Sequence, residues 1–373
     1  MSAAPDVVIL GCGIVGAATA LEGARAGMSV TVVERDTPGS GATAAGMGHI
    51  VVMDDSPAQL ALTSYSRSLW NELAPELPAA VEYSQCGTIW VAADDEEMAE
   101  VHRKFNHYTS HDISAEVVGP AELREAEPNL CPALAGGLCV PNDAVLYPPA
   151  AAAFFMDQAR RHNAQLLYGR CTSAAHGEVL LEDGTKLGAG IIVNATGAVS
   201  PELTPGICVK KRKGHLVITD RYPGFLNHQL VELGYLKSAH ASTADSVAFN
   251  VQPRQTGQIL IGSSRQFGAE DNEVDHGIVA AMLERAALYM PAIAKLSALR
   301  IWSGFRAATP DKLPLIGPTE DPTLFLATGH EGLGITTSLA TARILVDHLL
   351  QRQSAIASEP YLPSRLAVRA AHV

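Results

Sequence analysis

The hydrophobic pattern of the first 34 residues consists of two apolar runs separated by a stretch of helical spacing. Residues 6–10 and 29–33 are short runs rich in Val, which predict two β-strands. Residues 17–28 place their larger apolar side chains on one helical face. The pattern therefore predicts a strand–helix–strand unit at the start of the chain.

Between residues 57 and 200 the pattern predicts helices and strands in mixed order. Helical spacing predicts helices over 57–75, 94–108, 120–128 and 150–162. Apolar runs predict two strands joined by a turn within 81–92, and single strands over 136–140, 165–169 and 191–197. The Asp183-Gly184 pair favours a tight turn and predicts a hairpin over 179–187.

From about residue 208 to residue 300 the pattern changes to that of antiparallel strands. We predict strands over 216–219, 246–252 and 258–262, followed by a helix over 276–290. A last strand over 323–330 leads into an amphipathic helix over 335–349. These pieces predict a nucleotide-binding domain assembled from non-contiguous segments, with an antiparallel sheet domain inserted between them.

A glycine-rich loop joins the first predicted strand to its helix. Gly11, Gly13 and Gly16 have the GxGxxG spacing that permits a tight turn, a close approach to a pyrophosphate and close helix–strand packing. Glu34 ends the second strand, where a carboxylate can accept hydrogen bonds from ribose hydroxyls. The alternative is an ordinary strand–turn–helix with small residues. We therefore predict a dinucleotide site, which the unit alone does not assign to FAD or NAD.

Two further glycine-rich stretches are candidate ligand contacts. Residues 38–48 are mostly small and directly follow the second strand, so their backbone can lie close to a flat ligand. Gly332 and Gly334 precede the last helix, whose positive end would face a ligand bound there. The alternatives are a surface loop and a plain loop with glycine turns.

Arg306 and His49 are the side chains most suited to bind a substrate. Arg306 lies among small and apolar residues, and its guanidinium can hold a carboxylate through two parallel hydrogen bonds. His49 follows the first small-residue loop. Each can instead have a purely structural role, which is the commoner case for a lone histidine.

Several polar residues are assigned no chemistry. Asp54 and Asp55 are interpreted as solvated or as the N-cap of a helix. The basic run 210–213 is interpreted as a solvated turn, with docking of an acidic partner as the alternative.

The composition excludes several classes of protein and partner. A net charge of −12 argues against nucleic acid and anionic membrane surfaces as partners. We expect no signal peptide and no transmembrane segment, and a cytoplasmic location. The 6 cysteines contain no CxxC pair, so we expect reduced thiols and no iron–sulfur or zinc site.

These motifs together resemble the FAD-dependent amine oxidoreductases that include D-amino acid oxidase, glycine oxidase and sarcosine oxidase. The resemblance covers nearly the whole chain. It rests on the GxGxxG loop with Glu34, on residues 39–47, on Asn194-Ala-Thr-Gly197, on residues 304–311 with 314–317, and on residues 329–335.

The resemblance implies FAD, bound without a covalent link, as the cofactor. It implies a Rossmann-type FAD-binding domain over 1–80, 140–207 and 301–373, and an inserted antiparallel-sheet substrate domain over 81–139 and 208–300. The implied FAD-binding residues are Gly11, Gly13, Ile14, Val15, Gly16, Glu34, Arg35, Ser40, Thr43, Ala45, Gly46, Met47, Cys171, Ala195, Thr196, Gly197, His330, Gly332, Leu333, Gly334, Ile335 and Thr336.

Within this family the sequence of residues 45–49 and 329–341 most resembles that of the bacterial D-hydroxyproline dehydrogenase β subunit. Arg306 falls on the arginine that glycine and D-amino acid oxidases use for the substrate carboxylate. The cysteine that bonds the flavin in sarcosine oxidase would fall near Gly304, and the lysine of that enzyme near Ile335. The tyrosine that glycine oxidase places over its substrate would fall near Asn250, which can itself bond the substrate.

The implied activity is hydride transfer from the CH–NH bond of a small amino acid to flavin N5, with cis-4-hydroxy-D-proline or D-proline as the substrate. Arg306, His49 and Asn250 are the candidate catalytic residues. Alternatives are a glycine, D-amino acid or sarcosine-type oxidase that uses O₂, and a flavin-binding structural subunit of a multisubunit dehydrogenase. An NAD-dependent dehydrogenase is less favoured. Companion redox subunits or a homo-oligomer are possible partners.

Overall fold

The two apolar runs at the start of the chain form neighbouring parallel strands. In the computed structural model, which describes residues 4–234 and 245–367, β1 (Val7–Leu10) pairs with β2 (Val30–Glu34). Helix α1 (Ile14–Arg25) connects them and packs its small apolar residues on the sheet. The predicted strand–helix–strand unit is therefore confirmed.

This unit is the centre of a six-stranded sheet. Its strand order is β18-β19-β12-β1-β2-β8, and only β18 runs antiparallel to its neighbour. The other strands are β8 (Gln165–Tyr168), β12 (Ile191–Asn194), β18 (Leu315–Pro318) and β19 (Leu324–Thr328). The central strands β1, β12 and β19 are buried on both faces, which explains why they read as continuous apolar runs, whereas the edge strand β8 is partly exposed.

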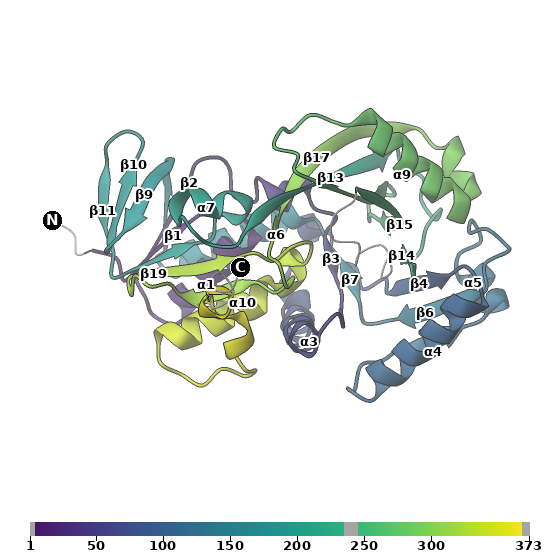
Figure 1. Ribbon diagram of the computed structural model, residues 1–373, viewed down its shortest axis with the longest axis horizontal. Helices are drawn as coiled ribbons and strands as arrows, with labels where there is room; N and C mark the ends of the chain where they lie inside the picture. Colours follow the sequence, from purple (N-terminus) through teal and green to yellow (C-terminus); the bar gives the residue numbers. More distant parts are fainter. Residues whose placement is uncertain (1–3, 235–244, 368–373) are drawn as a thin grey trace.

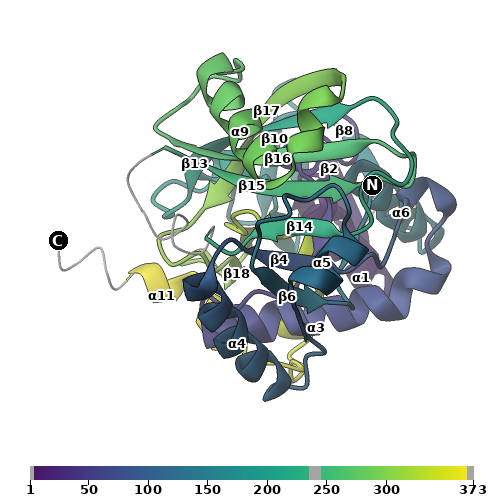
Figure 2. The ribbon, with the colours of Figure 1, turned by 90° about the vertical axis from the view of Figure 1, so that its right-hand side faces the viewer.

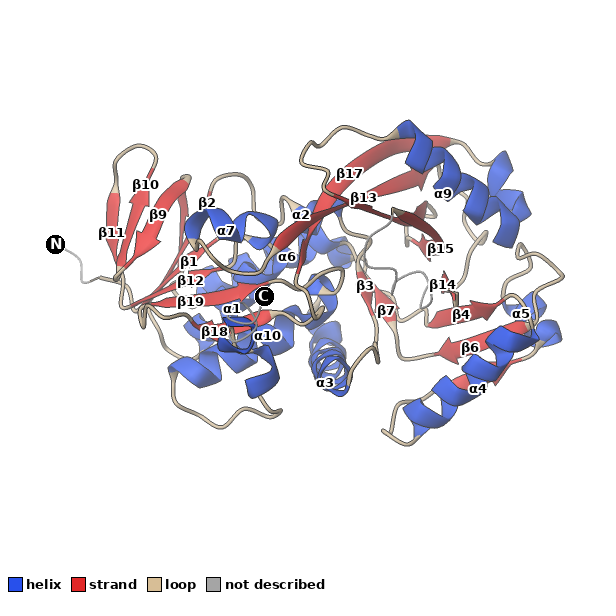
Figure 3. Ribbon diagram, in the orientation of Figure 1, coloured by secondary structure: helices blue, strands red, loops and turns tan. Residues whose placement is uncertain are grey.

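Helices cover one face of this sheet (Figure 3). Helix α1 packs between α6 (Pro148–Arg161) and α10 (Gly334–Leu349), and α10 also contacts α3 (Pro57–Leu73). Their buried side chains and those of the sheet form one large apolar core. A small sheet of β9 (Cys171–Ala175), β10 (Glu178–Leu181) and β11 (Lys186–Gly188) lies at one end (Figure 1).

An eight-stranded sheet forms the other half of the molecule, and Figure 2 shows its strands side by side. Its order is β17-β13-β16-β15-β14-β4-β6-β5, and only the β14–β4 pair is parallel. The strands are β4 (Thr88–Ala92), β5 (Glu116–Val118), β6 (Gly136–Val140), β13 (Lys210–Thr219), β14 (Gln229–Glu232), β15 (Ser246–Pro253), β16 (Ile259–Phe267) and β17 (Ala298–Ala308).

Shorter elements complete the structure. Helices α4 (Asp95–Thr109), α5 (Pro120–Ala126) and α9 (His276–Tyr289) pack on the eight-stranded sheet. Strands β3 (His49–Ile50) and β7 (Ala144–Val145) pair with each other, and α2 (Ala42–Ala45), α7 (Ser200–Leu203) and α11 (Ser364–Ala367) are single turns. The mixed α/β fold is confirmed, whereas the boundaries of the two predicted domains stay a prediction.

Three local predictions were wrong. Residues 81–92 form one strand instead of two, because residues 79–81 are a 3₁₀ turn and Ser84 makes only an isolated bridge to Val145. The basic run 210–213 lies in β13 and is no solvated turn, since Lys213 is buried and pairs with Asp271. Asp54 is neither solvated nor an N-cap, because its side chain is buried and pairs with Lys104. Asp55 is exposed, as predicted, and pairs with Lys312, and Ser56 caps α3.

No helix of the described residues is long and apolar enough to cross a membrane.

Candidate active site

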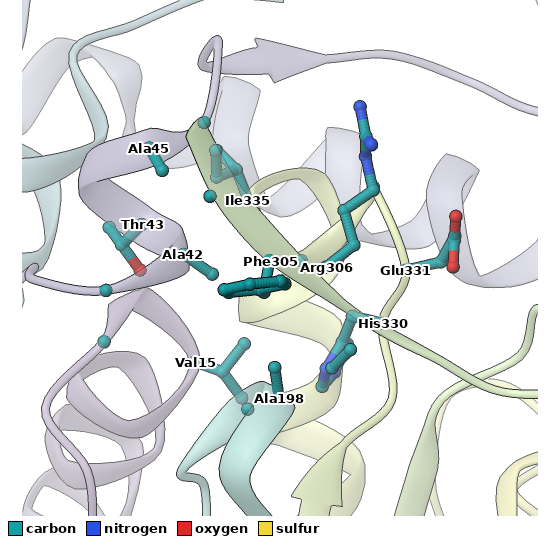
Figure 4. A pocket seen from close by; sticks show the side chains of 18 of the residues that line it. Val15, Ala42, Thr43, Ala45, Ala198, Phe305, Arg306, His330, Glu331 and Ile335 are labelled. Atoms are coloured by element: carbon teal, nitrogen blue, oxygen red, sulfur yellow. The ribbon is translucent and has the colours of Figure 1, made fainter. Parts of the chain in front are cut away.

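A cavity of about 690 Å³ lies between the two large sheets. It is lined by the β1–α1 loop, by residues 40–49, by the loops that follow β12 and β19, and by the facing surface of the eight-stranded sheet. Figure 4 shows side chains from these separate segments converging on it. Ligands of open α/β sheets commonly bind beyond the carboxyl ends of the strands, where this cavity begins.

The β1–α1 loop is built for a close approach of backbone. Gly11 has a φ of +96°, which disfavours a side chain there. A Cβ atom on Gly16 would overlap with the carbonyl oxygen of Gly11, so the helix can lie against the loop only with glycine at this position. The GxGxxG spacing therefore brings the N-terminus of α1 to the wall of the cavity.

The N-terminus of α1 presents backbone donors to the cavity. Its cap residue, Gly13, has no side chain to satisfy the first N–H groups, and only the Ile14 N–H donates to a side chain, Thr43 Oγ1, at 3.0 Å. Glu34 is buried beside the loop and accepts from the Cys12 N–H at 2.6 Å. A helix N-terminus with a neighbouring carboxylate matches a pyrophosphate and a ribose.

Arg306 extends from β17 into the cavity lining. Its Nη1 donates to the backbone carbonyl of Ser264 at 2.9 Å, which fixes the guanidinium plane. Gly214 lies so close to Nη1 that any side chain there would displace the arginine. Figure 4 shows that the side chains of Arg306 and its neighbour Phe305 point in different directions from the strand.

His49 is held by the loop that precedes α10. Its Nε2 lies 3.2 Å from the carbonyl oxygen of Gly332, so this nitrogen must carry the hydrogen. Its Nδ1 then has a lone pair and no partner among residues 4–234 and 245–367. Burial, with a smaller effect of the Arg306 charge, lowers the pKa of His49 to about 4. The ring is therefore neutral at neutral pH.

His330 and Thr336 have different positions in the second glycine-rich loop. His330 lines the cavity, and its Nε2 bonds to Thr341 Oγ1 at 3.0 Å. Thr336 is fully buried and does not line the cavity; its hydroxyl donates to the His49 carbonyl at 2.9 Å. Its hydroxyl therefore joins β3 to α10, and its contact with FAD stays a prediction.

The structure brings nearly all the other predicted residues together. Gly16 supports the loop from behind and does not line the cavity. The residues that do line it are Gly11, Gly13, Ile14, Val15, Glu34, Arg35, Ser40, Thr43, Ala45, Gly46, Met47, His49, Cys171, Ala195, Thr196, Gly197, Asn250, Arg306, His330, Gly332, Leu333, Gly334 and Ile335.

Sequence reasoning missed several polar residues of the cavity wall. Trp90, Gln229, Ser263 and Glu331 each line it and each have a buried polar atom without a partner in the described part of the chain. Only Glu331 lies in a glycine-rich motif, where it was assigned no role, and a lone Trp or Gln inside a strand usually signals packing. The pairing of distant strands brings them to the cavity, and the local pattern contains no signal for it.

The described residues contain no group of three or more His, Cys, Asp or Glu side chains that could hold a metal ion.

A dinucleotide-type loop at a cavity that reaches a second sheet is the arrangement expected of an enzyme that binds a dinucleotide cofactor. The chain matches the family DAO, FAD dependent oxidoreductase, over residues 6–348. The chain belongs to this family, and FAD is its cofactor. The predicted family, cofactor and class of enzyme are confirmed.

Individual relatives cover almost the full length of the chain. Glycine oxidase from Geobacillus kaustophilus is 29% identical over 377 residues, which cover 96% of this chain and 97% of the relative. The crystal structure of glycine oxidase from the same organism has a TM-score of 0.86 at 27% identity and covers 97% of this chain and 98% of its own. Hydrogen cyanide synthase subunit HcnC from Pseudomonas aeruginosa is 27% identical over 427 residues, covering 96% of each chain.

The buried state of His330 gives a prediction for stability against pH. Burial lowers the pKa of His330 from 6.5 to about 3, so the unfolded chain binds a proton more readily than the folded one below pH 6.5. Stability is therefore lost as the pH falls below 6.5, by about 2 kcal/mol between about pH 7 and about pH 5. We expect His330→Asn to remove this part of the pH dependence in urea unfolding.

His102→Asn is the matched control, because His102 is exposed. It should unfold with the same pH dependence as the wild type. An unchanged pH dependence in His330→Asn would contradict the assignment of a buried neutral imidazole.

Proposed function

We propose that this chain oxidises the CH–NH bond of a small amino acid, and that the substrate is cis-4-hydroxy-D-proline or D-proline. The observation that carries the proposal is the joint position of Arg306 and His49 in the cavity that begins at the β1–α1 loop. A fixed guanidinium suits a carboxylate, and an imidazole lone pair suits an amine. An α-amino acid carries these two groups on one carbon.

The residues of the cavity fit FAD. We propose that the N-terminus of α1 and Glu34 hold the pyrophosphate and the ribose, and that the loop before α10 lies along the flavin. The glycines that let backbone approach the cavity, Gly11 and Gly16, support this, because a Cβ at either position would meet backbone atoms. The N-terminus of α10, which starts at Gly334, turns its positive end towards the cavity.

The chain's own residues orient the substrate and accept a hydrogen bond from its amine. Arg306 binds the carboxylate and fixes the α-carbon, because its own plane is fixed by Ser264. His49 is neutral, so its Nδ1 accepts a hydrogen bond from the substrate amine and orients the nitrogen. FAD, when bound, would supply the acceptor for the hydride that leaves the α-carbon, and the nitrogen would lose its proton to water. The product is an imine, which water hydrolyses.

The electron acceptor separates two forms of this activity. We propose a dehydrogenase that passes electrons to a partner or a dye, because the sequence of residues 329–341 resembles that of a dehydrogenase subunit. The relative named glycine oxidase supports the second candidate, an oxidase that uses O₂. The relative named as a subunit of hydrogen cyanide synthase supports companion subunits, with a structural flavin-binding subunit as the remaining alternative.

A panel of D- and L-amino acids, assayed with a redox dye under nitrogen and with O₂ alone, tests this proposal. We expect turnover of cis-4-hydroxy-D-proline and D-proline with the dye, and much slower turnover with O₂. Equal rates of turnover with O₂ and with the dye would show that the enzyme is an oxidase and not a dehydrogenase. Turnover of glycine or sarcosine in preference to the cyclic substrates would contradict the proposed substrate.

A further inference from the structure

Three polar side chains form a row on the eight-stranded sheet where it faces the cavity. Val231 of β14 pairs with Trp90 of β4 on one side and with Asn250 of β15 on the other. Paired residues of neighbouring strands point to the same face, and so does Gln229, two positions from Val231. All four line the cavity, and Figure 2 shows the three strands side by side.

The three side chains of this row are buried, and each has a polar atom without a hydrogen-bond partner in the described part of the chain. Trp90 and Gln229 are each 2% exposed, and Asn250 is 7% exposed. Trp90 Nε1, Gln229 Oε1 and Asn250 Oδ1 have no hydrogen-bond partner among residues 4–234 and 245–367. A buried polar atom without a partner costs about 1–3 kcal/mol, so three of them in one row indicate a place where a ligand supplies the partners.

The chemistry of the three atoms defines the group that fits them. The indole Nε1 can only donate, so the ligand group must accept; this excludes an ammonium. The two amide oxygens can only accept, so the group must also donate; this excludes a carboxylate. A neutral group that both donates and accepts fits this row: a carboxamide can satisfy all three atoms, and a hydroxyl can accept from the indole and donate to one of the two amide oxygens. A methyl group or a hydrogen would leave them unpaired.

Trp90 is held in place from behind. The ammonium of Lys104 lies 5.2 Å from the centre of the Trp90 ring, and Lys104 is fully buried and paired with Asp54. A cation over an aromatic ring attracts its face and restricts the ring. The indole is therefore a fixed donor, which suits recognition better than a mobile side chain would.

The row lies within reach of a substrate held at Arg306. The Arg306 guanidinium donates to the backbone carbonyl of Ser264 on β16. Asn250 of β15 pairs with Gly262, which lies two residues before Ser264 on β16. Strand geometry puts Asn250 roughly 8 Å from Ser264, two residues along and one strand across. A group that reaches the row from an α-carbon fixed by Arg306 must therefore belong to the side chain of a small amino acid.

We propose that Trp90, Gln229 and Asn250 recognise a hydroxyl or carboxamide on the substrate's side chain. The preferred substrate is therefore a small amino acid with a neutral hydrogen-bonding side chain. This inference rests on the proposed function, because it uses Arg306 as the carboxylate site. It predicts that glycine, sarcosine and alanine are poor substrates, because they leave the row unpaired, which sites built for a hydroxyl penalise strongly.

Matched substrate pairs test the proposal. The pairs are cis-4-hydroxy-D-proline with D-proline, D-serine with D-alanine, and D-asparagine with D-leucine, which differ mainly in the hydrogen-bonding group. We expect the wild type to favour the polar member in kcat/KM by at least about tenfold in the pairs that it turns over. Trp90→Phe, Gln229→Met and Asn250→Leu remove the hydrogen-bonding atoms at similar volume. Each variant should lower the ratio of kcat/KM between the polar and the apolar member about tenfold, mainly because kcat/KM for the polar member falls.

Val231→Ala is the matched control, because Val231 lies between Trp90 and Asn250 on the row and has no polar atom. It should change both members of a pair alike. An equal or higher kcat/KM for the apolar members in the wild type, or an unchanged preference in all three variants, would overturn this proposal while the proposed function stands. If no amino acid reduces the flavin, the proposed function fails, and this proposal with it.

Discussion

Arg306→Met is expected to lower kcat/KM for the amino acid substrate by about a hundredfold or more. The guanidinium carries the fixed positive charge that we assign to the substrate carboxylate, and loss of one partner of such a pair costs about 2–5 kcal/mol. Methionine keeps much of the length and volume of the side chain, so the loss reports the charge and its hydrogen bonds. KM should rise and kcat should fall, because the α-carbon is no longer fixed against its acceptor.

Two further variants make this result specific. Arg306→Lys should recover only part of the activity, since an ammonium restores the charge but lacks the planar pair of donors. Arg300→Met is the control: Arg300 lies on the same strand, β17, is exposed and does not line the cavity. It should have wild-type kinetics. Wild-type kinetics in Arg306→Met would remove the carboxylate site from the proposal.

Gly16→Ala is expected to abolish most FAD binding. The new methyl group would overlap with the Gly11 carbonyl, a backbone atom that cannot rotate away. Helix α1 would have to move off the loop, at a cost of about 1–3 kcal/mol or more. The displaced N–H groups of the helix N-terminus would no longer meet the pyrophosphate. We expect at least tenfold weaker FAD binding, measured as the flavin content of purified protein and by titration of the apoprotein.

Gly23→Ala serves as the control because it lies in the same helix. A Cβ there would lie 3.3 Å from a Val30 methyl carbon, a side-chain contact that can relax. This variant should retain wild-type flavin content, and circular dichroism should show both variants folded. Full FAD occupancy in Gly16→Ala would show that the close packing of loop and helix is dispensable.

The part of the site nearest the β1–α1 loop was predictable because each of its motifs is local. A strand, the GxGxxG loop and the helix follow each other within the first 25 residues, and their order in the sequence is their order in space. The same holds for Gly332 and Gly334 before α10. Glycine spacing records the steric limits of a tight turn, so it can be read without knowledge of the rest of the fold.

The opposite wall was not predictable because it depends on strands that are distant in sequence. Trp90, Val231 and Asn250 become neighbours only because β14 inserts between β4 and β15. The basic run at 210–213 was mispredicted for a related reason. Its charges looked like those of a solvated turn, yet Arg212 pairs with Glu331 and Lys213 with Asp271 across the fold.

Anaerobic reduction of the bound flavin by single amino acids tests whether this chain oxidises an amino acid held at Arg306. The purified holoprotein is mixed with each member of the panel, and the loss of the visible flavin absorbance is followed. The account predicts rapid bleaching by cis-4-hydroxy-D-proline or D-proline, and bleaching slower by about a hundredfold or more in Arg306→Met. A flavin that no amino acid bleaches, or one bleached equally fast in Arg306→Met, would contradict it.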